Sequence, residues 1–477
     1  MKLQFFLSIL LFLIISISFG QEDDFKENIS EYVKTVQKEN EIPGLSLCIV
    51  KDDGIIYKSH SGFASIEHEV PIKETSIYRV YSLTKTVISV GVFQLIEQGK
   101  LSLEDKILTH ISGLPTAWNT VQIKHLLTHS SGLPDMRVFG TAETINEAQA
   151  KKLVFEQKMT FKLGERYSYN QTNFWLLHRI IEKVTGKTLS DFIIDNQFEG
   201  ERKNVFFSSD SKQIVKNRVT SYFPFSTGKM IIDLPTLEGD YMYAANGLNI
   251  TLNEFVKWDK RLKDNKLLKE ETMVEMWKTF PYTKSNKMFT YAWDKIMLNN
   301  HESYGFTGSL ITAYRIFPKD NLSIFLLSNG LGKIYDIDTI VNSIATMVNR
   351  DIFDVHELAY KSFKPIVMNE NYNIIKSKYL ELKKSSNHQE IDFEDLLNSL
   401  GYELLNSQKK EKAVKLFKLN TQEFPNSANT YDSLGEAYFT LKKYDLALKN
   451  YKKAITLGGT NGNAEEMLHK IKAIKNK

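Results

Sequence analysis

The chain has very few of the residues that cross-link a protein or bind metals. Cys48 is the only cysteine among 477 residues, so no intramolecular disulfide can form and stability has to come from packing. Cys48 lies in an apolar segment, residues 44–50, that predicts a strand, and we interpret it as a buried, unreactive thiol. The ten histidines contain no His-Glu-x-x-His pattern. The sequence therefore predicts neither a metal site nor a cofactor site.

The chain also lacks a large net charge. Its 61 Lys and Arg residues nearly balance 57 Asp and Glu residues, which leaves a net charge of +4. Such a small excess gives no basic footprint for nucleic acid, so we expect no nucleic-acid partner. Hydrophobic residues make up 42% of the chain and aromatic residues 12%, which is enough for two or three packed domains.

The N-terminal residues predict a signal peptide over residues 1–20. Lys2 gives a positive start, residues 5–17 are apolar, and Ser18 and Gly20 are the small residues that a signal peptidase reads. The alternative is an uncleaved anchor, but a spanning helix needs about 20 apolar residues. No cysteine follows the apolar run, so no lipid anchor is indicated. We expect a periplasmic or secreted protein that starts at Gln21 and keeps no stable membrane anchor.

A candidate nucleophile stands before the longest internal apolar stretch. Ser82 and Lys85 precede residues 87–96, which predict a buried helix. Residues three apart share a helix face, so the Lys85 amine falls within reach of the Ser82 hydroxyl. Unpaired N–H groups at a helix start also favour an oxyanion. The pattern suits acyl transfer. The alternative is a capped core helix with Lys85 in solvent, since Ser-x-x-Lys spacing recurs three times elsewhere.

Further motifs follow in order and favour the acyl-transfer interpretation. Residues 121–134 read VQIKHLLTHSSGLP, residues 164–174 read GERYSYNQTNF, and residues 246–248 read NGL. Together with Ser82 and Lys85, these motifs make residues 42–350 resemble the penicillin-recognising serine hydrolases. That family contains class C β-lactamases, D-alanyl-D-alanine peptidases and related esterases. The resemblance implies an α+β domain over residues 21–355, with an antiparallel sheet flanked by helices and an inserted, mainly helical region.

The resemblance also implies roles for individual residues. Ser82 would attack a carbonyl, Lys85 would help to take its proton, and Tyr169 would relay protons to the leaving group. A phenol titrates near pH 10, so Tyr169 needs a nearby cation such as Lys85 to act as a base; otherwise it is an ordinary loop aromatic. Gln171 replaces the family's asparagine and is one methylene longer, with the same amide groups. We expect it to orient Lys85 or a substrate carbonyl less tightly.

The third family motif, Lys-Thr-Gly or His-Thr-Gly, is best matched by Phe306-Thr307-Gly308. The alignment implies that Thr307 and Gly308 border the site and that Ser309 supplies the second oxyanion N–H beside that of Ser82. The family's cation helps to bind a substrate carboxylate, which a phenylalanine cannot do. A rival match is the Ser-Thr-Gly at residues 226–228. His301 would supply the missing cation if its loop folded back; otherwise it is a surface histidine.

Two functions from different classes follow from these motifs. The first is a serine hydrolase that cleaves an ester, amide or peptide bond, rather than a true β-lactamase, because backbone oxyanion donors survive the loss of a side-chain cation. The second is a catalytically weak binding or sensor protein, as Phe306 and Gln171 suggest. His125 and His129 would be a ligand pair or a proton relay, or else core histidines, which we favour.

Secondary structure can also be predicted at both ends of this domain. We expect a helix over residues 25–39 and strands over 45–51 and 55–60 around an Asp-Asp-Gly turn. Near its end, strands over 310–317 and 322–327 and a helix over 335–349 are expected. The middle of the domain should be helical and rich in loops.

Residues 356–477 predict a separate all-α region. Leu400-Gly401 recurs as Leu434-Gly435, a separation of 34 residues, which is the tetratricopeptide period. Other positions keep this register, including Ala413 with Ala447 and Phe417 with Tyr451. The pattern predicts helical hairpins over about residues 397–464, between flanking helices. Such an array would bind a peptide or protein partner, or would pack against the hydrolase domain as an appendage.

Overall fold

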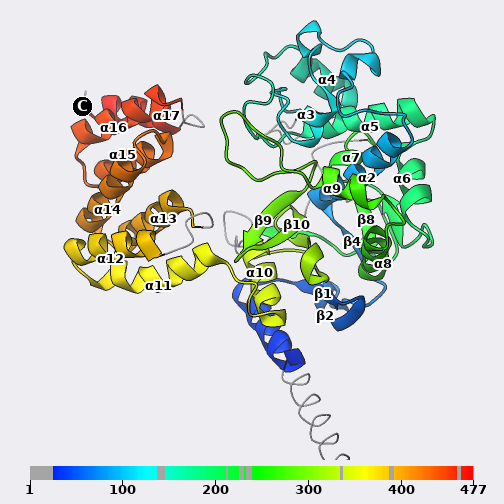
Figure 1. Ribbon diagram of the computed structural model, residues 1–477, viewed down its shortest axis with the longest axis horizontal. Coiled ribbons are helices and arrows are strands. Elements are labelled where there is room, and N and C mark those ends of the chain that lie inside the picture. Colours follow the sequence, from blue (N-terminus) through cyan, green and yellow to red (C-terminus); the bar gives the residue numbers. More distant parts are fainter. Residues whose placement is uncertain are drawn as a thin grey trace, which may run out of the picture. The chain divides into compact units, whose positions relative to one another are not determined.

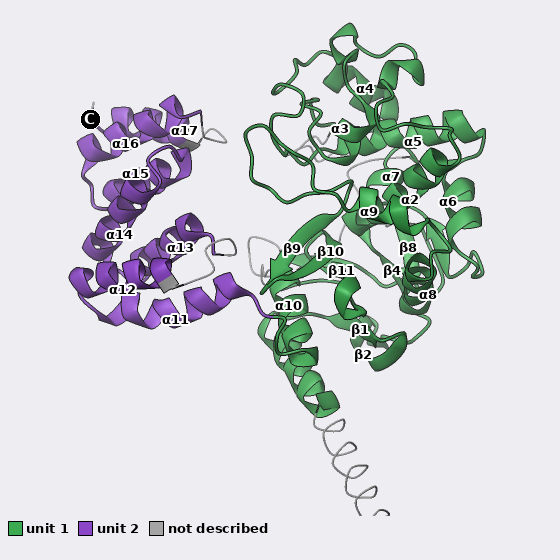
Figure 2. Ribbon diagram, viewed as in Figure 1, with its two compact units in different colours: residues 1–352 green, residues 353–477 purple. Residues whose placement is uncertain are grey.

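The computed structural model describes residues 25–136, 145–210, 213–224, 230–232, 239–332, 337–385, 391–458 and 463–475. The chain divides into two compact units, residues 1–352 and 353–477 (Figure 2). The predicted signal peptide and the rival motif at 226–228 lie outside the described residues. Within the described ranges, no helix combines the length and apolar character needed to cross a bilayer.

The first unit is built around a seven-stranded sheet in which every neighbouring pair is antiparallel (Figure 1). The strand order is β3-β2-β1-β12-β11-β10-β9, so the first strand of the sheet along the chain, β1, pairs with the last, β12. The sheet confirms the predicted α+β class. Its strands are β1 (Gly44–Lys51), β2 (Gly54–Ser65), β3 (Val70–Pro71), β9 (Asp294–Leu298), β10 (His301–Gly308), β11 (Thr312–Phe317) and β12 (Leu322–Ser328).

The two faces of this sheet pack against different helices, because successive side chains of a strand point to opposite faces. Leu45, Leu47 and Ile49 of β1 pack with the helix over residues 25–39 and with α10 (Ile337–Val348). Cys48 and Val50 belong to the core on the other face. Cys48 is fully buried, and burial raises the pKa of its thiol to about 12, in keeping with an unreactive core cysteine.

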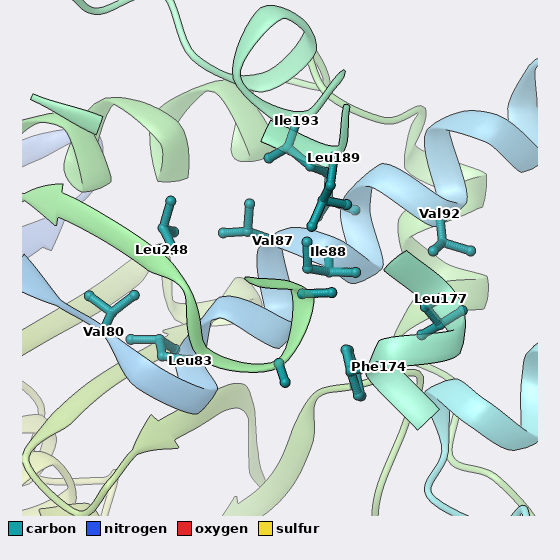
Figure 3. Close-up of a cluster of buried hydrophobic side chains, with 14 of the residues drawn as sticks. Val80, Leu83, Val87, Ile88, Val92, Phe174, Leu177, Leu189, Ile193 and Leu248 are labelled. Carbon is teal, nitrogen blue, oxygen red and sulfur yellow. The ribbon is translucent and has the colours of Figure 1, made fainter. Parts of the chain in front are cut away.

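The larger core surrounds α2 (Thr84–Glu97), which packs near α5 (Gln171–Thr185) and α6 (Leu189–Gln197) (Figure 3). Every residue from 84 to 95 is buried, so this helix has no solvent face. Figure 3 shows Val87 and Ile88 among the side chains of this cluster. The remaining helices of this region are α3 (Ile123–Leu127), α4 (Glu147–Phe155), α7 (Tyr243–Asn246), α8 (Leu252–Lys263) and α9 (Glu270–Met276).

The strand that precedes Ser82 and α2 belongs to a second, three-stranded sheet. Its strands are in the order β4 (Ile77–Arg79), β8 (Leu248–Thr251) and β5 (Val205–Phe207). Immediately after β4, the Val80 N–H donates to the Leu248 carbonyl (3.0 Å). The Val80 carbonyl accepts from Thr312 Oγ1 of β11 (3.1 Å). The segment just before Ser82 is therefore held between the two sheets.

The strand expected at residues 310–317 is shorter than predicted. β11 begins only at Thr312, whereas Phe306, Thr307 and Gly308 form the end of β10. Ser309 and Leu310 have φ angles of 48° and 62°, and Ile311 N–H donates to the Gly308 carbonyl (3.0 Å). These values describe a two-residue hairpin turn with both φ angles positive. The apolar Leu310 therefore lies in a turn and is about half exposed.

The second unit is entirely helical in its described residues. Its helices are α11 (Val355–Asn369), α12 (Tyr372–Ser385), α13 (Phe393–Asn406), α14 (Lys410–Glu423), α15 (Ala428–Thr440), α16 (Tyr444–Thr456) and α17 (Asn463–Lys475). Gly401 of α13 faces the Phe417 ring of α14, and Gly435 of α15 faces the Tyr451 ring of α16. The same glycine–aromatic contact thus recurs after 34 residues.

The clearance at these two glycines predicts unequal effects of the same substitution. A Cβ at Gly401 would lie 2.5 Å from Phe417 Cε1, whereas at Gly435 the closest Tyr451 atom is 3.0 Å away. We expect Gly401→Ala to destabilise the second unit by about 1–3 kcal/mol through overpacking. Gly435→Ala should cost less, because the Tyr451 ring leaves more room there; the roughly 1 kcal/mol that alanine gains in helix propensity applies to both positions. Denaturant unfolding of both variants measures the difference; equal stabilities would contradict the packing argument.

Candidate active site

Ser82 lies in a short 3-10 turn, η1 (Tyr81–Leu83), directly before α2. The sequence suggested that Ser82 stands at the start of the helix itself, but α2 begins two residues later, at Thr84. Tyr81 has a φ of 47°, which is uncommon for a bulky side chain. A backbone held in this region carries local strain and turns the chain sharply before Ser82.

Lys85 is fully buried, with an exposed fraction of 0%. Its Nζ lies 3.5 Å from Ser82 Oγ and donates to the Ala245 carbonyl of α7 at 2.6 Å. It also lies 4.9 Å from the ring centroids of both Tyr169 and Phe174. A carbonyl and two ring faces therefore stabilise the buried ammonium. The alternative that placed Lys85 in solvent is wrong.

Tyr169 approaches Ser82 from a different part of the chain. Its Oη donates a hydrogen bond to Ser82 Oγ at 2.5 Å. It lies just before α5, whose N-cap Asn170 accepts from the Thr172 N–H through its side chain. The structure thus brings the hydroxyl, the amine and the phenol together around Ser82 Oγ. Three groups in this arrangement can move a proton from a nucleophilic hydroxyl to a leaving group.

Gln171 is close in sequence but is not joined to this trio. Its backbone N–H donates to Asp135 Oδ1 at 3.1 Å. Its side-chain Oε1 is buried and has no hydrogen-bond partner among the described residues. The described part of the chain shows no hydrogen bond from Gln171 to Ser82, Lys85 or Tyr169.

The Thr307–Ser309 segment lies beside the turn that carries Ser82. A Cβ at Gly308 would overlap the Val80 carbonyl oxygen and Thr312 Oγ1, so only glycine allows β10 to approach η1 this closely. Thr307 is part-buried and Ser309 is exposed in the hairpin turn. Gly308 thus lies against Val80, which precedes Ser82 by two residues. The end of β10 therefore borders the site.

Phe306, which the sequence alignment places at the family's cation, forms part of an aromatic wall. Its ring stacks on that of Tyr169, with centroids 6.2 Å apart and planes 23° apart. The Phe289 ring meets it edge-on at 6.0 Å. His301 does not replace the missing cation: it begins β10, five residues and about 16 Å of strand away, where its Nδ1 lies 2.9 Å from Asp320.

His125 and His129 are both core residues, as interpreted. Their exposed fractions are 6% and 0%. Burial, together with Lys124, lowers the pKa of His125 to about 4. His129 nevertheless has a neighbour that the sequence did not suggest, because its ring lies 4.7 Å from the Tyr169 ring. Ala245 and Phe174 were also missed; the nearby Asn246-Gly247-Leu248 motif was the available signal for Ala245.

One group of potential metal ligands occurs in the described ranges. Ligand atoms of His178, Glu182 and Asp240 lie within 4.8 Å of one another. The Arg179 guanidinium, however, contacts Glu182 at 2.7 Å and Asp240 at 3.2 Å. A permanent positive charge already pairs with both carboxylates. We therefore assign the group to an ion-pair network.

Comparison with known proteins gives the chain a clear set of relatives. A family model described as beta-lactamase matches residues 26–341. Penicillin-binding protein 4* of Bacillus subtilis (strain 168) is 30% identical over 175 residues, covering 35% of this chain and 38% of that protein. Protein flp of Staphylococcus aureus (strain MW2) is 25% identical over 181 residues, covering 36% of each. The chain thus spans little more than a third of the length of these relatives.

Solved structures show the same fold at low identity. An octameric penicillin-binding protein homologue from Pyrococcus abyssi has a TM-score of 0.58 at 21% identity, covering 68% of this chain and 77% of that one. EstCE1, a hydrolase with promiscuous acyltransferase activity, has a TM-score of 0.57 at 16% identity, covering 70% and 99%. D-amino acid amidase from Ochrobactrum anthropi SV3 also has a TM-score of 0.57, at 17% identity, and the match covers 69% of this chain and 99% of that one.

The geometry predicts that the Tyr169 hydroxyl is needed for turnover. Tyr169→Phe should lower kcat/KM for an activated ester by about 10²–10⁴-fold, the usual size of a general acid–base contribution. Tyr282→Phe is the matched control, because Tyr282 Oη donates to the Thr128 carbonyl (2.6 Å) away from Ser82. It should cost at most about tenfold, the effect of one hydrogen bond. Steady-state kinetics that show equal losses would remove Tyr169 from the chemistry.

Proposed function

Because this chain belongs to the beta-lactamase family, we propose that it is an exported serine hydrolase that cleaves an ester, amide or peptide bond. The observation that carries this proposal is the meeting of Lys85 Nζ and Tyr169 Oη at Ser82 Oγ. Relatives of the same fold include a hydrolase with acyltransferase activity and a D-amino acid amidase. Export rests on the predicted signal peptide.

In the proposed reaction, Tyr169 first loses its phenolic proton; Ser82 Oγ then attacks the substrate carbonyl and passes its own proton to the Tyr169 oxygen. Tyr169 then gives a proton to the leaving alcohol or amine, and Ser82 keeps the acyl group as an ester. Water takes the place of the leaving group and releases the acid by the reverse proton transfers. The buried Lys85 ammonium favours the anionic form of the adjacent phenol.

Backbone N–H groups of Ser82 and Ser309 are proposed to bind the oxyanion. Support comes from the close approach of β10 to η1, which only Gly308 permits. Fixed donors at this point act without reorganising during the reaction. Thr307, and the side-chain amide of Gln171 at the start of α5, are proposed to contact the substrate.

Phe306 supports a substrate without a carboxylate beside the scissile bond. Its ring stacks on Tyr169 and offers no charge to a carboxylate. An uncharged ester or amide is therefore a better match than a β-lactam, whose carboxylate would lie next to an aromatic ring. The same observation supports an alternative function, a catalytically weak protein that binds or senses such a ligand.

We further propose that the second unit is a tetratricopeptide module that binds a peptide or protein partner or places the enzyme. Its support is the paired helices and the glycine–aromatic contacts that recur after 34 residues.

The proposed function predicts a covalent intermediate on Ser82. Incubation with an activated ester or a fluorophosphonate should add the acyl or phosphonyl mass to the chain, and Ser82→Ala should abolish it. Ser407→Ala is a matched control, because Ser407 also begins a Ser-x-x-Lys sequence but is an exposed residue of the second unit. Intact-mass spectrometry and ester turnover measure both effects. A folded wild-type protein with neither labelling nor turnover would favour the binding or sensor function.

A charge at position 306 should change the substrate preference. Phe306→Lys is expected to raise acylation by a carboxylate-bearing β-lactam about 10- to 100-fold, the value of one charge-assisted hydrogen bond. Phe306 is part-buried, so a longer amine can reach solvent. Phe306→Leu removes the ring without adding charge and should bring no such gain. Acylation rates for a β-lactam and a neutral ester distinguish the variants, and a gain in both variants would argue against a charge effect.

A further inference from the structure

His129 holds the backbone on both sides of Tyr169. Its carbonyl accepts from the Ser168 N–H at 2.9 Å. Its ring Nδ1 accepts from the Asn170 N–H at 3.1 Å. Two anchors on one residue therefore hold the backbone N–H groups of both residues that flank Tyr169, and so restrict the direction in which the phenol points.

The protonation state of His129 follows from these partners. The Asn170 backbone N–H can only donate, so Nδ1 has to be an unprotonated acceptor. Asn173 Nδ2 lies 3.1 Å from the same atom, and Asn173 Oδ1 accepts from Ser131 Oγ at 2.6 Å. This chain of bonds orients the amide to donate as well. The imidazole is therefore neutral, with its proton on Nε2.

The surroundings of the His129 ring also require the neutral form. The ring lies 4.7 Å from that of Tyr169 and 5.4 Å from that of Phe174. Lys85 Nζ lies 4.9 Å from both of these rings. A second positive charge in this buried cluster would repel the Lys85 ammonium with little screening by water. His129 also has a φ of 51°, so its backbone is held in a conformation that few residues adopt.

We infer that His129 is a positioning residue for the Ser82 reaction: a neutral imidazole whose Nδ1 fixes the Tyr169 phenol against Ser82 Oγ. This inference rests on the proposed function. A displacement of about 1 Å at a reacting group can cost 10²-fold in rate, so a lost anchor here should be visible in kcat. Protonation of Nδ1 would break both of its hydrogen bonds.

Two substitutions of His129 test the hydrogen-bond acceptor Nδ1 and the aromatic ring separately. His129→Asn places an amide oxygen close to the position of Nδ1, and asparagine tolerates a positive φ. His129→Phe keeps an aromatic ring but leaves the Asn170 N–H and the Asn173 amide without their acceptor. His125→Asn is the control, because His125 is also buried and its Nδ1 accepts from the Gln122 N–H, away from Tyr169.

We expect His129→Phe to lower kcat for an activated ester about 10- to 100-fold with little change in KM. His129→Asn should keep most of the wild-type kcat, and His125→Asn should not change it. Unfolding curves establish that each variant is folded. Wild-type kcat in folded His129→Phe, or equal losses in His129→Phe and His129→Asn, would overturn the inference.

A measurement on the wild-type chain decides the inference without turnover. In ¹⁵N-histidine-labelled protein, assigned by loss of one signal in His129→Asn, the His129 Nδ1 should carry no proton at neutral pH, as its role as acceptor from the Asn170 N–H requires. A proton on Nδ1 at neutral pH would overturn the inference. If the wild-type protein has an unprotonated His129 Nδ1 but does not turn over the ester, only the proposed function is contradicted. The hydrogen-bonded arrangement of His129 beside Tyr169 would still be supported.

Discussion

The burial of the Lys85 ammonium is the constraint on which the site depends. Lys85 belongs to a helix without a solvent face, so its charge is removed from water at a cost of several kcal/mol. That cost has to be met by groups placed around Nζ: the Ala245 carbonyl, the Ser82 hydroxyl and the ring faces of Tyr169 and Phe174. These groups come from α7, η1, the segment before α5 and α5 itself. Stabilising one cation therefore brings four elements to one point.

The elements that meet Lys85 are fixed in turn by polar contacts outside the trio. Arg79, at the end of β4, donates to Asn246 through both its Nε and its Nη2 (3.3 and 3.2 Å), which secures α7 beside Ala245. The Leu248 N–H donates to Thr84 Oγ1 (3.1 Å), which joins β8 to the first residue of α2. Thr312 anchors Val80 to the large sheet. Each of these hydrogen bonds joins two different elements. The position of the site is therefore fixed by the same packing that forms the core.

The sequence predicted those features that depend on local spacing or on motif order. The hairpin around Asp52 and Asp53 and the reach of Lys85 to Ser82 follow from short-range geometry. The length of β11 and the position of Leu310 did not, because the apolar residues 310 and 311 give no local sign that the turn occupies Ser309 and Leu310. His129 read as an ordinary core histidine. Its contact with Tyr169 joins residues 40 apart, and no local pattern encodes such a pairing.

The residue type at position 306 affects the electrostatic environment of Lys85, although phenylalanine itself carries no charge. A cation at position 306 would stand next to Tyr169, whose ring already faces the Lys85 ammonium at 4.9 Å. Like charges in a poorly screened cluster repel, so a neutral ring at 306 lowers the cost of keeping Lys85 protonated and buried. The same ring packs edge-on against Phe289. The neutral ring at position 306 and the buried Lys85 ammonium are therefore compatible neighbours of the same Tyr169 ring.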